Sequence, residues 1–230
     1  MIKYLEWESK HFNKEIYRLV DHRITNDQLR ECLEAKDIDL IQCRCDVSKT
    51  KAINLLCSYG FELVNVSITL SKEINQVCDM DEHIFVATKN DIYAIKDIAT
   101  NSFSYSRFFH PFFDNNRARN IYAQWAEKSV TGKFDDICFV AKETSVIFGF
   151  VTLRFVSERV YRIGLIAVNA DYKGKGVGKK LLNGALNYAS SYGCTSLIVE
   201  TQYENKDALV LYRKLGFSLE LVEAWMYLIP

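Results

Sequence analysis

The residues best suited to chemistry form a loop rich in glycine and lysine at positions 173–180, which reads Lys-Gly-Lys-Gly-Val-Gly-Lys-Lys. Its three alternating glycines allow the backbone to bend so that successive N–H groups point into one concavity. The loop follows an apolar stretch and opens a segment with helical spacing, so the positive end of a helix dipole adds to its lysines. The sequence therefore predicts a site for an anion such as pyrophosphate, with a plain strand–helix turn as the alternative. The spacing matches neither the P-loop nor the dinucleotide-binding pattern.

A second pair of polar residues follows downstream. Asn205 and Tyr212 are seven residues apart, close to two helical turns, and therefore share one face of a helix about 10 Å apart along its axis. The same helix carries Ala208, Leu211 and Leu215, so its polar residues would lie where core meets ligand. A helix N-cap for Asn205 and a half-buried core position for Tyr212 are the alternatives, and both are compatible with ligand contact.

Hydrophobic spacing predicts the elements that must hold these groups. The expected order is a strand at 84–87, helices at 91–103 and 116–130, strands at 137–142, 147–155 and 161–168, a helix at 177–192, a strand at 196–201, a helix at 206–215 and a strand at 217–228. This order predicts an α/β fold with a mixed sheet.

A polar stretch at 71–83 divides this region from the residues before it. We expect a small N-terminal α/β domain at 1–83 and a larger domain at 84–230. Residues 40–61 also echo residues 196–217, since both read as strand, helix, Gly-Phe and strand, although chance similarity is the alternative. If the echo is real, the first domain is a partial, degenerate copy in which Leu56 replaces Tyr212 and Lys49 replaces Asn205.

Composition excludes several classes of protein. Lys+Arg and Asp+Glu both number 29, so the basic excess typical of nucleic-acid-binding domains is absent. No run approaches the roughly 18 apolar residues of a membrane helix, and the N-terminus lacks the apolar region of a signal peptide. Seven cysteines without a CxxC pair, beside four histidines, indicate free thiols in a reducing cytoplasm and no metal site.

Together these motifs resemble the GNAT acetyltransferase superfamily. The strand 163–168, the spacer 169–172 and the glycine-rich loop are similar to its central motif, which begins with Arg or Gln where this chain has Lys173. Asn205, Tyr212 and the pair Gly216-Phe217 are similar to its second motif. The resemblance covers residues 84–230 and implies a GNAT acyltransferase fold with acetyl-CoA as co-substrate.

The resemblance also implies roles for individual residues. The strand would bind the pantetheine arm and polarise the thioester carbonyl through backbone N–H groups, the loop would hold the pyrophosphate, and Asn205 would contact the cofactor. The residues implied in acetyl-CoA binding are Ile166, Ala167, Val168, Lys173, Gly174, Lys175, Gly176, Val177, Gly178, Lys179 and Asn205.

Tyr212 is the implied catalytic residue, which would donate to the departing sulfur. A phenol with a pKa of ~10 and a thiol near ~8.5 make full proton transfer uphill by roughly 2 kcal/mol, which favours a hydrogen bond to the thiolate. The proton acceptor for the amine stays open among Glu200, His110 and water.

The run 103–113 is unusually aromatic and contains Arg107 and His110 but no acidic residue. Aromatic rings stack on bases and arginine forks onto phosphate, so a nucleotide-linked substrate would suit it. Packing as core or as a dimer interface is the alternative.

Within the superfamily, Trp7-Glu8 and the runs 106–108, 122–125 and 132–135 resemble the TDP-fucosamine acetyltransferase type. That implies N-acetylation of a dTDP-linked 3- or 4-amino-dideoxyhexose for surface polysaccharide such as the O-antigen of lipopolysaccharide, by a homodimer. We therefore assign substrate-binding roles to Arg107, His110, Tyr122, Trp125 and Glu200. Acetylation of a protein N-terminus or another small amine is the alternative, and a non-catalytic acetyl-CoA-binding module is an alternative of another class.

Overall fold

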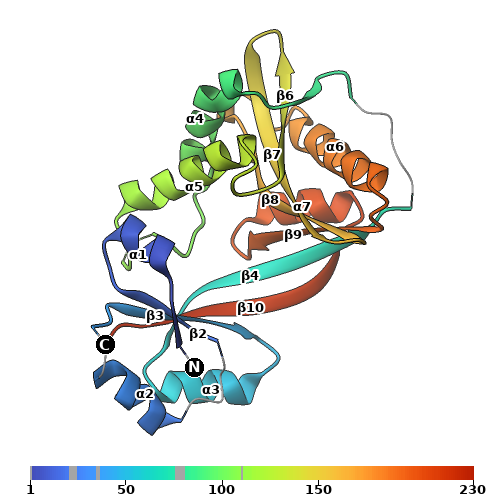
Figure 1. Ribbon diagram of the computed structural model, residues 1–230. Helices are drawn as coiled ribbons and strands as arrows, with labels where there is room; N and C mark the ends of the chain where they lie inside the picture. Colours follow the sequence, from blue (N-terminus) through green and yellow to red (C-terminus); the bar gives the residue numbers. More distant parts are fainter. Residues whose placement is uncertain (1, 21–24, 35–36, 76–80, 110) are drawn as a thin grey trace. The chain divides into compact units, whose positions relative to one another are not determined.

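The fold is described from a computed structural model that covers residues 2–20, 25–34, 37–75, 81–109 and 111–230 (Figure 1). The chain forms two compact units, and neither is continuous in sequence. The first unit comprises residues 1–68, 106–117 and 221–230, and the second comprises residues 69–105 and 118–220.

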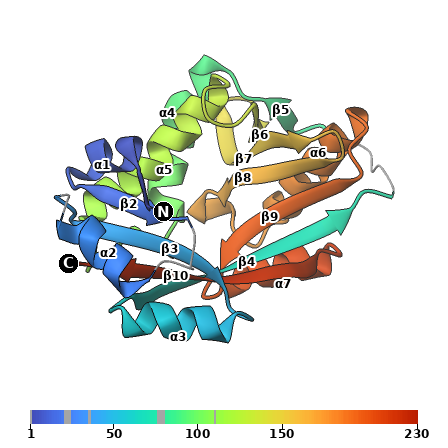
Figure 2. The same cartoon turned by 60° about the horizontal axis from the view of Figure 1, so that its bottom comes forward.

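The first unit is a small mixed sheet with helices. Its elements are β1 (Ile2–Tyr4), α1 (Glu6–Phe12), β2 (Ile16–Leu19), α2 (Asn26–Glu34), β3 (Leu40–Asp46), α3 (Thr50–Ser58), the first part of β4 (Glu62–Glu73) and most of β10 (Ser218–Leu228). The strand order is β1-β2-β3-β10-β4, in which β2 and β3 are parallel and β10 is antiparallel to β3 (Figure 2). Alternate residues of β3 and β10 pack with Leu29 of α2 and Leu56 of α3 in one core.

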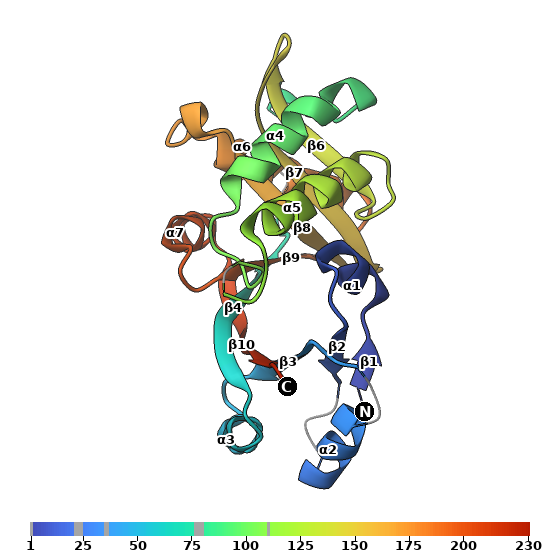
Figure 3. The same ribbon diagram turned by 90° about the vertical axis from the view of Figure 1, so that its left-hand side faces the viewer.

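The second unit contains the elements that the hydrophobic spacing predicts, except for most of the last strand, together with two 3₁₀ turns that it does not predict. They are β5 (Ile84–Val86), the 3₁₀ turn η1 (Lys89–Asp91), α4 (Ile92–Ser102), most of α5 (Asn115–Val130), β6 (Ile137–Glu143), β7 (Val146–Ser157), β8 (Val160–Val168), the 3₁₀ turn η2 (Ala170–Tyr172), α6 (Val177–Ser191), β9 (Ser196–Gln202) and α7 (Lys206–Lys214). Together with the end of β4 the strand order is β4-β9-β8-β7-β6-β5. Helices α4 and α5 lie on one side of this sheet, and α6 and α7 lie on the other (Figure 3). The predicted α/β fold with a mixed sheet is confirmed.

The two segments that echo each other in sequence have the same local structure. Both helices, α3 and α7, are followed two residues after their last residue by a glycine with positive φ, +88° at Gly60 and +83° at Gly216. In both, the next phenylalanine N–H donates to the carbonyl five residues back at 3.0 Å, from Phe61 to Leu56 and from Phe217 to Tyr212.

The strands that follow these two helices are exchanged. Strand β4 follows α3 in the chain but lies beside β9 in the sheet. Strand β10 follows α7 in the chain but lies beside β3. Because of this exchange, and because residues 106–117 return to the first unit, the compact units differ from the continuous stretches 1–83 and 84–230. That the first 83 residues are a degenerate repeat of the later domain stays a prediction.

Candidate active site

Strands β8 and β9 separate at their carboxyl ends. Their parallel ladder runs from the pair Val160–Ser196 to the pair Ile163–Val199, yet β8 continues to Val168 and β9 to Gln202. On its other edge β8 stays paired with β7 up to Val168. Within the described chain, the end of β8 therefore has no ladder partner on its β9 side, and its backbone groups on that edge are open to a ligand.

A bulge in β8 begins where the ladder with β9 ends. Val151 of β7 pairs with Ile166 and Leu153 pairs with Ile163, so Gly164 and Leu165 together oppose the single residue Thr152. The Leu165 amide, displaced from the ladder, donates to the hydroxyl of Thr152 at 2.8 Å. The bulge bends β8 at the point where it leaves β9.

A buried carboxylate supports this bulge. Asp135 is 1% exposed and accepts a hydrogen bond from the Thr152 hydroxyl at 2.5 Å, and its other oxygen lies 3.0 Å from Nε of Arg154. Burial raises the pKa of the Asp135 carboxyl. A Cβ atom at Gly164 would lie 1.9 Å from Asp135 Oδ2, so only glycine leaves room for the carboxylate there. Asp135 and Gly164 were not among the predicted site residues, although glycine inside a strand is a known sign of a bulge.

The glycine-rich loop adopts a backbone that needs glycine. Gly174 and Gly176 have φ of +75° and +80°, and a Cβ at either would meet no atom within 4 Å. Gly176 is the N-cap of α6, so no side chain caps the helix, and the first intrahelical bond runs from Lys180 N to Gly176 O at 3.1 Å. The amides of the three residues between them thus have no intrahelical acceptor, which suits them to bind an anion.

Two further features shape the loop region. A Cβ at Gly178 would lie 2.9 Å from Leu211 Cδ2, so this glycine lets α6 approach α7. Lys173, Lys175 and Lys179 are exposed, whereas Lys180 forms an ion pair of 3.0 Å with Asp81. The exposed lysines add positive charge around the open amides.

Helix α7 places the two residues of the second motif. Asn205 is its N-cap, with Oδ1 accepting from Ala208 N at 3.4 Å and Nδ2 donating to the Thr201 hydroxyl at 3.2 Å. Tyr212 is 3% exposed and its ring packs against Phe217. Burial raises the pKa of the Tyr212 phenol, so the phenol keeps its proton at neutral pH and is a hydrogen-bond donor.

Replacing Asn205 by alanine should therefore weaken the start of α7. We expect the free energy of unfolding to fall by about 1 kcal/mol, the usual cost of losing an N-cap side chain. Urea denaturation followed by circular dichroism measures this. Asn205→Asp keeps the capping oxygen and should lose less, and an equal loss in both variants would contradict the capping role.

The predicted substrate residues fall in different parts of the chain. Glu200 follows the last β8–β9 pair and forms an ion pair of 3.4 Å with Arg162. Tyr122 and Trp125 form a row of packed rings with Phe103 and Phe134, with Tyr122 7% exposed.

The aromatic run 103–113 is itself divided between the units. Arg107 belongs to the first unit, where Phe108 and Phe113 pack against Phe12, and His110 lies outside the described residues. The implied acetyl-CoA residues therefore all belong to the second unit, whereas the described substrate residues are divided between the two units. The substrate roles stay predictions.

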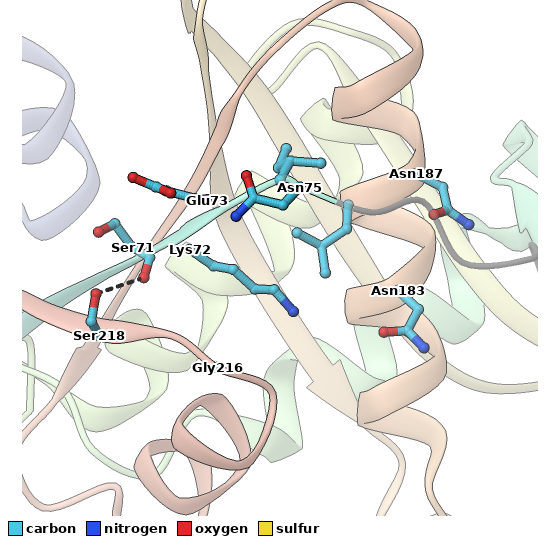
Figure 4. A pocket seen from close by; sticks show the side chains of 10 residues that line it. Ser71, Lys72, Glu73, Asn75, Asn183, Asn187, Gly216 and Ser218 are labelled. Atoms are coloured by element: carbon cyan, nitrogen blue, oxygen red, sulfur yellow. Dashed lines mark hydrogen bonds between the residues drawn. The ribbon is translucent and has the colours of Figure 1, made fainter.

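A cavity of about 690 Å³ lies elsewhere in the second unit. Polar side chains from the end of β4 and from α6 line it, among them Lys72 and Asn183, which face the same space (Figure 4). It contains none of the predicted site residues, and the Lys72 ammonium donates to the Leu215 carbonyl at 2.6 Å. This cavity is therefore distinct from the residues implied in acetyl-CoA binding.

The described residues contain neither a metal-binding cluster nor a membrane-spanning helix. No group of three or more His, Cys, Asp and Glu side chains in the described ranges is placed to hold a metal ion. Among the helices of those same ranges, none has the length and apolar character needed to cross a membrane.

Several known proteins are similar to this chain in sequence. The model of the acetyltransferase (GNAT) family matches residues 92–217. The dTDP-fucosamine acetyltransferase of Escherichia coli O6:H1 is 33% identical over 98% of this chain and 97% of its own length. The spore coat polysaccharide biosynthesis protein SpsD of Bacillus subtilis is 26% identical over 56% of this chain and 45% of its own. N-alpha-acetyltransferase 30 of Saccharomyces cerevisiae is 33% identical over 49% of this chain and 60% of its own.

Solved structures share the fold at low sequence identity. A GCN5-related N-acetyltransferase from Sphaerobacter thermophilus superposes with a TM-score of 0.66 at 14% identity, over 99% of this chain and 76% of that one. A tandem GNAT protein from the clavulanic acid biosynthesis pathway gives a TM-score of 0.62 at 11% identity, over 93% of this chain and 75% of that one.

Proposed function

The chain belongs to the acetyltransferase (GNAT) family, and we propose that it acetylates the amine of a dTDP-linked 3- or 4-amino-dideoxyhexose for surface polysaccharide synthesis. The observation that carries the substrate class is the 33% identity to the Escherichia coli dTDP-fucosamine acetyltransferase, which extends over 98% of this chain. This alignment covers both compact units, whereas the family model matches only residues 92–217.

The acetyl-CoA site is proposed where β8 leaves β9. The open edge at Ile166, Ala167 and Val168 would hydrogen-bond the pantetheine arm, and the uncapped amides of α6 would hold the pyrophosphate. Acetyl-CoA supplies the acetyl thioester. The backbone N–H groups on this edge would stabilise negative charge that develops on the carbonyl oxygen.

Tyr212 is proposed to assist the leaving group. The amine nitrogen bonds to the carbonyl carbon as the C–S bond breaks, and the buried phenol donates a hydrogen bond to the departing sulfur. Because burial raises the pKa of this phenol, full proton transfer from Tyr212 is more uphill than for an ordinary tyrosine, and hydrogen bonding is favoured. The proton of the amine passes to a base, for which Glu200, His110 and water stay the candidates.

We also propose that the enzyme is a cytoplasmic homodimer. Free thiols are typical of proteins of a reducing compartment, and the structure shows them at Cys43, Cys45, Cys57, Cys138 and Cys194.

Acetylation of a protein N-terminus is the second candidate, because the yeast N-alpha-acetyltransferase 30 is also 33% identical to this chain. That match spans only 49% of the chain, which favours the sugar substrate.

The test is to incubate the purified protein with acetyl-CoA and a panel of dTDP-amino-dideoxyhexoses while following release of free thiol. We expect rapid release with one regioisomer, which would also locate the amine at C3 or C4. A peptide with a free N-terminus and a small polyamine serve as the competing acceptors. Thiol release with the peptide and with no sugar would overturn the sugar assignment and leave the acetyltransferase assignment standing.

A further inference from the structure

Charged and aromatic side chains share one face of the sheet in the first unit. Arg18 of β2 pairs with Gln42 of β3, which pairs with Tyr227 of β10. Two residues further along β3, Arg44 pairs with Trp225, so these five side chains lie on the same face. The other face of β3 carries the apolar core.

A third arginine reaches this face from residues 106–117. Arg107 donates to Tyr227 Oη at 2.9 Å, to Gln42 and to Glu8 at 3.3 Å, and its guanidinium carbon lies 4.0 Å from the Trp225 ring centre. The Arg107 side chain is only 12% exposed. Its donors are thus largely occupied by the protein, which makes it the anchor of the cluster.

The guanidinium groups outnumber the carboxylates that face them. Arg44 forms an ion pair of 2.5 Å with Glu223, and Glu8 is shared between Arg107 at 3.3 Å and Arg18 at 3.7 Å. In these ion pairs of the described residues, three arginines share two carboxylates.

Arg18 is the arginine with the weakest partner. Its contact with Glu8 is the longest of the three, and its buried Nε has no hydrogen-bond partner in the described part of the chain. Its side chain is nevertheless 37% exposed, so a ligand can reach it. Burial and then the nearby Arg107 lower the pKa of Arg18, which means that the cluster destabilises its charge. An anion bound at Arg18 would relieve this repulsion.

We infer that Arg18 and Arg44, held around Trp225 by Arg107, bind the diphosphate group of a nucleoside diphosphate. Guanidinium groups match phosphate oxygens with paired donors, and two of them within reach of one indole ring suit a multiply charged anion. The inference rests on the proposed function, since the ligand would be the diphosphate of the dTDP-sugar. Coenzyme A also carries a diphosphate, so the test must separate the two sources.

The test is isothermal titration calorimetry of the full chain with dTDP, inorganic pyrophosphate, thymidine and acetyl-CoA. Arg18→Gln should weaken dTDP binding about tenfold or more, because it removes a charge-assisted contact. Arg30→Gln on α2, an exposed arginine outside the cluster, is the matched control and should bind dTDP as the unmodified protein does. Acetyl-CoA binding should be unchanged in both variants.

Thermal melting of each variant separates lost binding from lost folding. Arg18→Lys keeps the positive charge but loses the paired donors of the guanidinium, so it should bind dTDP with intermediate affinity. If pyrophosphate binding also depends on Arg18 and thymidine gives no binding signal, the protein recognises the diphosphate itself. An unchanged dTDP affinity in folded Arg18→Gln, or acetyl-CoA binding that falls with it, would overturn the inference. If Arg18→Gln loses dTDP binding while the unmodified protein acetylates no amino sugar, the diphosphate site is supported and only the proposed reaction is refuted.

Discussion

Tyr212→Phe is expected to lower kcat about 100-fold, within the range found when one hydrogen-bond donor to developing negative charge is removed. The substitution removes one buried hydroxyl from a ring that packs against Phe217, so the fold and the acetyl-CoA site should stay intact. The departing thiolate then loses its donor while the rest of the site is unchanged. Steady-state kinetics and acetyl-CoA titration on the same preparation measure the two effects separately.

The matched control is Tyr203→Phe, which removes the hydroxyl of a tyrosine that is 60% exposed and should leave kcat unchanged. The raised pKa of Tyr212 gives a further check. Since the phenol stays protonated above its ordinary pKa, kcat of the unmodified enzyme should show no loss from tyrosine ionisation below about pH 10. An unchanged kcat in Tyr212→Phe would refute its role at the leaving group and would favour another donor.

Gly164→Ala is expected to lower the free energy of unfolding by about 3 kcal/mol, at the upper end of the usual cost of overpacking a core. The new Cβ would lie 1.9 Å from Asp135 Oδ2, and Thr152 and Arg154 hold that carboxylate in place. To make room, the carboxylate must leave the Thr152 hydroxyl that binds the bulge amide. Denaturant unfolding gives the stability change.

The same variant should also impair function, because the bulge shapes the open end of β8. A displacement of this edge by about 1 Å would lower kcat/KM roughly 100-fold. Gly193→Ala is the control: its Cβ meets no atom within 4 Å and its φ is +75°, so its cost should stay near the roughly 1 kcal/mol of left-handed backbone.

A double-mutant cycle identifies the cause. Asp135→Ser shortens the side chain that the new methyl group meets, so Gly164→Ala should cost less in that background than alone. Equal costs in both backgrounds would show that the glycine is required for a reason other than Asp135.

The sequence predicted most of the local structure, namely the helices, the strands and the glycine-rich loop from residue 84 onward. The period of apolar residues located every helix and strand from residue 84 onward, because the core face of an element repeats with the period of its own backbone. The glycine-rich loop was readable because glycine at 174 and 176 permits the positive φ that the loop adopts. The helix that begins after Asn205 and carries Tyr212 followed from the helical repeat in the same way.

Only the tertiary structure decided which strands pair. The separation of β8 from β9, the exchange of β4 and β10 and the return of Arg107 to the first unit depend on contacts between residues far apart in the chain, which no local period encodes. The support of the bulge by Asp135 is of the same kind, because a buried carboxylate is placed by donors from other strands. The sequence by itself thus determined the elements and the motifs of the site. The packing of distant segments decided where the site opens and which arginines gather beside Trp225.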